Sequence, residues 1–290
     1  MAGLGQVLVL LDGSAGCESA LQVGLSLSRS YNSRLEALHI SFPHQASIAV
    51  LDDASGFVIN ESLVEKLDAN SGENAKRIQD KFSSICLREK VKIVEAADSF
   101  VAGEARAVLR QITGHEGPVL ATEGRIFDLI ILAKPEKSQG GIDSAVLEAA
   151  LFETGRPVMI VQGEKTDLIG ENIAIAWDGS REVAHSVAMS MPVIANAKSV
   201  NIFSVDSEVN HSNSESLKDY LSCHGIDSNT VNLESNSKPV ADTLLEAIHL
   251  SQSDLLIMGA FGQSPFNEFI FGGVTRTMLK LANIPIILAH

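Results

Sequence analysis

The sequence predicts an α/β protein built of two tandem doubly wound domains, each with a five-stranded parallel sheet. One observation is a repeat: an apolar run leads into Asp-Gly-Ser at residues 8–14 and again at 173–180. Another is that the apolar runs are continuous rather than alternating, as in parallel strands that helices cover on both faces. The length of 290 residues fits two domains of ordinary size.

The same succession of elements follows each Asp-Gly-Ser. A stretch with helical spacing of apolar residues comes first, then a small-polar break, then a short apolar strand that ends near Ile40 or Val205. The later apolar runs also match between the halves, 127–133 with 253–259 and 156–161 with 284–289. The crossover helices that a parallel sheet requires are expected at 142–152, 240–251 and 274–282.

The domain boundary is expected near residue 165, giving domains at 1–165 and 166–290 joined by the polar stretch 162–171. The first half is longer by about 40 residues. Because the second strands still align, the insertion lies after the second strand. It contains a loop with Gly and Pro, then a long amphipathic helix. We expect it to overhang the carboxyl ends of the strands, where such sheets bind ligands.

Composition excludes several classes of partner. The chain has 22 basic and 36 acidic residues, a net charge of −14 that repels nucleic acids and anionic lipid surfaces. Cys17, Cys86 and Cys223 form no C-x-x-C pair, which argues against a disulfide framework or a zinc cluster. The N-terminal stretch lacks the features of a signal peptide, and its apolar run is too short to span a bilayer. We therefore expect a cytoplasmic protein without nucleic-acid or membrane partners.

The Asp-Gly-Ser stretch has a simple structural interpretation, in which Gly makes a turn, Ser caps the next helix and Asp faces its N-terminus. The second half adds a Gly-rich segment, MGAFGQSPFNEFIFGGVTRTML, at 258–279. Its glycines let a ligand approach the backbone. The helix that begins near Val274 offers free N–H groups, which hold phosphate without a basic side chain. Thr275 can add a hydroxyl donor.

This segment, together with Asp178, resembles the universal stress protein family, whose nucleotide-binding members carry G-x2-G-x9-G-(Ser/Thr). The resemblance covers nearly the whole chain as two tandem Rossmann-like domains and is weakest over 41–127. It implies that the Asp binds ribose hydroxyls, that the end of the second strand meets adenine, and that the Gly-rich loop wraps the phosphates. By position these roles fall on Asp178, Val205, Met258, Gly259, Gly262, Gly272, Gly273, Val274 and Thr275.

The ligand that the resemblance implies is an adenine nucleotide, ATP, ADP or AMP, with or without Mg²⁺. Gly273 stands where nucleotide binders usually have Ser or Thr, so a hydroxyl contact to the terminal phosphates is missing. AMP and ADP then fit as well as ATP. Trp177, the one tryptophan of the chain, precedes the key Asp. It narrows the pocket, packs against the base or is buried in the core, and core burial is the simpler expectation.

The first half departs from the family pattern. Alignment on the strands puts Ala133 in place of Gly259. Glu136 likewise replaces Gly262. Ala resists positive φ, and a carboxylate repels phosphate. We therefore expect that only the second half binds nucleotide and that Asp12 serves the turn and the helix cap.

The predicted function is a stress-response binding or regulatory module that holds an adenine nucleotide in its C-terminal domain. A non-nucleotide-binding interaction scaffold and a weak ATPase remain as alternatives. Asp178 has no accompanying base or metal-ligand set, so we expect slow ATP hydrolysis at most. The resemblance also implies that the apolar last strands of the halves pair, giving a pseudo-dimer within one chain. Homodimerisation and a protein partner stay open.

Overall fold

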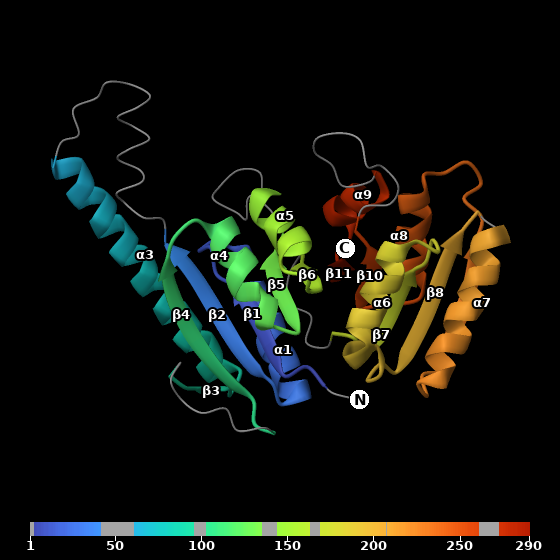
Figure 1. Cartoon of the computed structure of the whole chain (residues 1–290), viewed down its shortest axis with the longest axis horizontal. Coiled ribbons are helices and arrows are strands. Elements are labelled where there is room, and N and C mark those ends of the chain that lie inside the picture. Colours follow the sequence, from blue (N-terminus) through green and yellow to red (C-terminus); the bar gives the residue numbers. More distant parts are fainter. Residues whose placement is uncertain are drawn as a thin grey trace.

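A computed structural model describes residues 3–41, 61–95, 103–134, 144–162, 169–206, 208–260 and 273–290. Within these ranges the strands form one sheet of eleven, in the order β3-β4-β2-β1-β5-β6-β11-β10-β7-β8-β9. Helices cover both faces of this sheet (Figure 1). No helix in the described part of the chain has the length and apolar character needed to cross a membrane.

The first half supplies six of these strands. Its elements are β1 (Gln6–Leu10), α1 (Gly16–Tyr31), β2 (Arg34–Ser41), α3 (Glu61–Arg88), β3 (Lys92–Ile93), β4 (Arg106–Thr113), α4 (Glu116–Glu123), β5 (Leu129–Ala133), α5 (Ser144–Glu153) and β6 (Val158–Val161). The strands pair in parallel. The short β3 at the outer edge is an addition to the five strands that the sequence predicts.

The second half repeats the arrangement with five parallel strands. Its elements are β7 (Asn172–Ala176), α6 (Arg181–Ile194), β8 (Ser199–Val205), α7 (Glu208–Cys223), β9 (Asn229–Leu233), α8 (Val240–Leu250), β10 (Leu255–Gly259), α9 (Gly273–Leu281) and β11 (Ile286–Ala289). Apart from β3, the order of strands is the same in both halves. The predicted tandem of doubly wound units is confirmed. The predicted domain boundary, between residues 165 and 166, lies within 163–168, outside the described residues.

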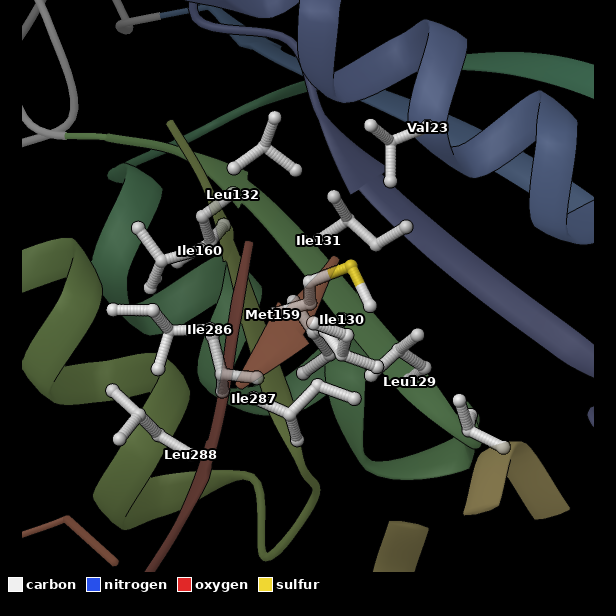
Figure 2. Close-up of a cluster of buried hydrophobic side chains, with 14 of the residues drawn as sticks. Val23, Leu129, Ile130, Ile131, Leu132, Met159, Ile160, Ile286, Ile287 and Leu288 are labelled. Atoms are coloured by element: carbon white, nitrogen blue, oxygen red, sulfur yellow. The ribbon is translucent and has the colours of Figure 1, made fainter. Parts of the chain in front are cut away.

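The two halves meet along β6 and β11, which pair antiparallel. Met159 lies opposite Ile287, and these two residues are equivalent in the repeat. The pair therefore lies on a pseudo-two-fold axis, as in a symmetric dimer interface. Both side chains are fully buried, within the apolar cluster of Figure 2. The predicted pairing of the last strands is confirmed.

The insertion of the first half contains α3, whose 28 residues compare with 16 in α7. Its later turns bury Ile78, Phe82 and Ile85 at helical spacing, so one face of α3 belongs to the core. Its beginning extends past the carboxyl ends of β2 and β4 (Figure 1). The loop expected before it, at 42–60, lies outside the described residues.

Candidate functional site

The second Asp-Gly-Ser forms a tight turn between β7 and α6. Gly179 has a φ of 73°, a conformation that glycine adopts without strain. The Ser180 backbone N–H donates to Asp178 Oδ1 at 2.9 Å. Ser180 Oγ in turn accepts a hydrogen bond from the Val183 N–H at 3.3 Å and so caps α6. The turn leaves the Asp178 carboxylate exposed at the carboxyl end of the sheet.

A cavity of about 530 Å³ opens beside this turn. It is bounded by the carboxyl ends of β7, β8 and β10 and by the first turns of α8 and α9. Seven of the nine residues singled out from the sequence line it: Asp178, Val205, Met258, Gly259, Gly273, Val274 and Thr275. The other two, Gly262 and Gly272, lie outside the described residues. The structure thus brings together residues from three separate parts of the second half.

The cavity wall has an apolar part and a polar part. Residues outside the predicted ligand set complete it: Trp177, Gly179 and Ser180, which the sequence analysis discussed in other roles, and Ala176, Phe203, Val240 and Leu244, which it did not single out. Val240 and Leu244 could not be recognised as cavity residues from the sequence, because they have the spacing of ordinary apolar residues in an amphipathic helix. Hydroxyl groups, the carboxylate of Asp178 and the start of α9 form the polar part. Such a mixture suits a ligand with an apolar ring at one end and polar groups at the other.

Gly259 is required by packing as well as by the cavity. A Cβ at this position would lie 2.8 Å from the Val183 backbone nitrogen and 3.1 Å from the Glu182 Cβ. The glycine therefore lets α6 pack directly against the end of β10. Gly273 differs, because a Cβ there would meet no atom of the described residues within 4 Å.

Ser186 supports the floor of the cavity, and the sequence analysis missed it. Its Oγ donates to the Met258 carbonyl at 2.9 Å and accepts from the Ala289 N–H at 2.8 Å. The residue is fully buried. The equivalent residue of the first half is Ala20. A buried serine on the apolar face of a helix is the signal that could have revealed this link.

Trp177 contributes to both the core and the cavity wall. Its backbone N–H donates to the Phe203 carbonyl at 2.8 Å. Its half-buried side chain packs against the core and also lines the cavity. The buried indole Nε1 has no hydrogen-bond partner among the described residues.

The first Asp-Gly-Ser makes the same turn in different surroundings. The Ser14 N–H donates to Asp12 Oδ1 at 2.9 Å. The Cys17 thiol also hydrogen-bonds this oxygen. Burial, assisted by the Asp12 charge, raises the pKa of Cys17 to about 12, so the thiol stays protonated. Asp12 is therefore tied into the protein, whereas Asp178 is open to solvent.

The insertion also covers part of the first turn. Arg77 of α3 donates through Nη2 to the Gly13 carbonyl at 3.4 Å and to Asn74 Oδ1 at 2.8 Å. The cavity that Gly13 and Ser14 line toward α3 measures only about 20 Å³. That volume has room for one water molecule and is far too small for a nucleotide.

Part of the chain matches the sequence model of a known protein family. Residues 197–290 match the sequence model of the Universal stress protein family. These residues belong to that family. A universal stress protein from Archaeoglobus fulgidus is similar over 98% of this chain and 97% of its own, with a TM-score of 0.66 and 12% identity. The universal stress protein resemblance recognised in the sequence is confirmed for the matched residues of the second half. The tandem fold is confirmed over the whole chain.

Two further solved structures extend the comparison. A putative universal stress protein from Pseudomonas aeruginosa is similar over 99% of this chain and 93% of its own, with a TM-score of 0.54 and 11% identity. A universal stress protein in complex with cAMP covers 55% of this chain and 97% of its own, with a TM-score of 0.32 and 15% identity. No curated protein matches the chain.

Proposed function

We propose that the C-terminal half of this universal stress protein binds an adenine nucleotide and that the protein is a stress-response binding module. Occupancy of the site would change its contacts with partners. The observation that carries the proposal is the cavity of about 530 Å³, in which the exposed Asp178 carboxylate lies between an apolar wall and the start of α9. The carboxyl ends of strands in an open α/β sheet are the usual place for such a ligand.

Each part of the wall suits one part of a nucleotide. The Asp178 carboxylate is an acceptor for two ribose hydroxyls. Val205, Val240 and Leu244 offer an apolar surface to a purine ring. The first N–H groups of α9, at Gly273 and after, have no acceptor within the helix and can donate to phosphate. Thr275, which is buried in the wall, adds a hydroxyl.

Mg²⁺ would enter together with the phosphates. In the parts of the chain that the structure describes, no group of three His, Cys, Asp or Glu residues could hold a metal ion. Mg²⁺ is commonly held by substrate phosphates, water and one or two carboxylates. Asp178 is the carboxylate of the described cavity wall.

Calorimetric titration with AMP tests the proposal. Wild type should bind at one site per chain. Asp178→Asn keeps the shape and the acceptor for the Ser180 N–H but loses the charge, and should weaken binding at least about tenfold. Asp12→Asn is the matched control and should bind like wild type. Binding that Asp178→Asn leaves unchanged would contradict the site assignment. Silence of the wild type with AMP, ADP and ATP would favour the interaction scaffold.

A further inference from the structure

The wall of the C-terminal cavity carries little charge. Among its described residues the Asp178 carboxylate is the one ionised side chain, and the rest are apolar residues, glycines, Ser180 and Thr275. Lys, Arg and His are absent from this lining. Protein sites for several phosphates usually place Arg or Lys beside them.

The segment that joins β10 to α9 adds no positive charge. Its sequence from 260 to 272 is AFGQSPFNEFIFG, which contains no Lys, Arg or His. Glu268 is its one ionisable residue. The complete stretch from Met258 to Val274 is therefore acidic on balance.

The nearest cationic side chains in sequence are engaged elsewhere or lie outside the lining. Arg181 is exposed, and its Nη2 lies 3.0 Å from Glu182 Oε1. Arg276 is exposed on α9 and does not line the cavity. The remaining positive potential comes from the N-terminus of α9, which carries about half a unit charge. That charge balances part of one phosphate and leaves further phosphates unbalanced.

We propose that this site selects adenosine compounds with one phosphate, such as AMP or cyclic AMP, over ADP and ATP. The inference rests on the proposed function and names its ligand class. In the absence of Mg²⁺, each added phosphate brings negative charge toward Asp178 with no cationic side chain in the described lining to offset it, and so lowers the affinity several-fold. The net charge of −14 acts in the same direction.

The first experiment measures AMP, ADP and ATP binding to wild type without Mg²⁺, at low and at high NaCl concentration. AMP should bind at least about tenfold more tightly than ATP at low salt. Salt screens the repulsion, so ATP affinity should rise with NaCl while AMP affinity changes little. ATP that binds as tightly as AMP, or that weakens as salt increases, would overturn the inference.

A second experiment adds the missing cation. Val274→Lys places an ammonium group on the first turn of α9 and should improve ATP binding more than AMP binding. Leu281→Lys, at the exposed far end of the same helix, is the control and should leave the preference unchanged. Equal gains for the two ligands in Val274→Lys would also overturn the inference.

The outcomes separate this inference from the proposed function. If ATP binds best and Asp178→Asn abolishes its binding, the nucleotide site stands and the charge preference falls. If none of the three nucleotides binds wild type at either salt concentration, both fall together.

Discussion

A Cβ on Gly16 would lie 3.0 Å from the Cβ of Ala133, so the start of α1 packs directly on the end of β5. The second half makes the same contact with the roles exchanged, because Gly259 is on the strand and Glu182 on the helix. Each half thus has one glycine where strand and helix meet. In the second half that glycine, Gly259, also lines the cavity, where no side chain covers its backbone.

Gly259→Ala should therefore destabilise the protein. The added methyl group would press on the Val183 backbone nitrogen and on the Glu182 Cβ, and overpacking of this kind costs about 1–3 kcal/mol. Glu182→Gly removes the second of these contacts. Urea denaturation measures the loss. Combining Gly259→Ala with Glu182→Gly recreates the pair found in the first half. The double variant should lose less than the two single variants together, and simple additivity would contradict this packing account.

The later turns of α3 should be essential for the first half. Phe82 is 2% exposed, and Phe82→Ala should lower the free energy of unfolding by about 3–5 kcal/mol. Leu87 lies on the same helix at 80% exposure, and Leu87→Ala should cost about 0.5 kcal/mol or less. Both values come from urea denaturation. Similar small losses of unfolding free energy in the two variants would show that α3 does not contribute to the core.

The three cysteines should differ sharply in reactivity. Cys223 is exposed, whereas Cys17 and Cys86 are buried. Burial raises the pKa of each buried thiol to about 12, so neither forms the reactive thiolate near neutral pH. Alkylation of the native protein followed by peptide mass spectrometry should label Cys223 alone. Rapid native labelling of Cys17 would contradict its contact with Asp12.

The same thiols make stability depend on alkaline pH. Their pKa is about 12 in the folded protein, against an ordinary value of 9.0. Above pH 9 the unfolded chain releases these protons while the folded chain retains them. The contribution of these two thiols to the free energy of unfolding is complete below pH 9 and is lost as the pH rises toward 12. Cys86→Ala should reduce this alkaline loss of stability. If the free energy of unfolding depends on pH in the variant as it does in wild type, the buried Cys86 thiol is not its cause.

Gly273→Ser tests the start of α9. A Cβ at this position would meet no atom of the described residues within 4 Å, so the hydroxyl fits beside them without a clash. A neutral donor that reaches the terminal phosphates should raise ADP and ATP affinity about three- to tenfold, the worth of one hydrogen bond, and leave AMP affinity little changed. Gly273→Ala is the control for helix stability and should not raise affinity. Equal effects of Ser and Ala would mean that the hydroxyl makes no contact with the ligand.

Much of this structure could be predicted from the repeat. Continuous apolar runs located strands such as β10, which was expected at 253–259 and spans Leu255–Gly259. The short β3 escaped prediction because Lys92 and Ile93 are both exposed and form no pattern. The contact of Arg77 with Gly13 joins residues 64 positions apart, which periodicity does not reveal. Ser186 escaped because its importance depends on carbonyl and N–H groups of two other strands.

A crystal structure of the protein soaked with AMP tests the central claim most directly. The account predicts one nucleotide per chain, with its ribose beside Asp178 and its phosphate at the start of α9, and no nucleotide beside Asp12. Nucleotide density beside Asp12, or density away from the cavity of the second half, would contradict it.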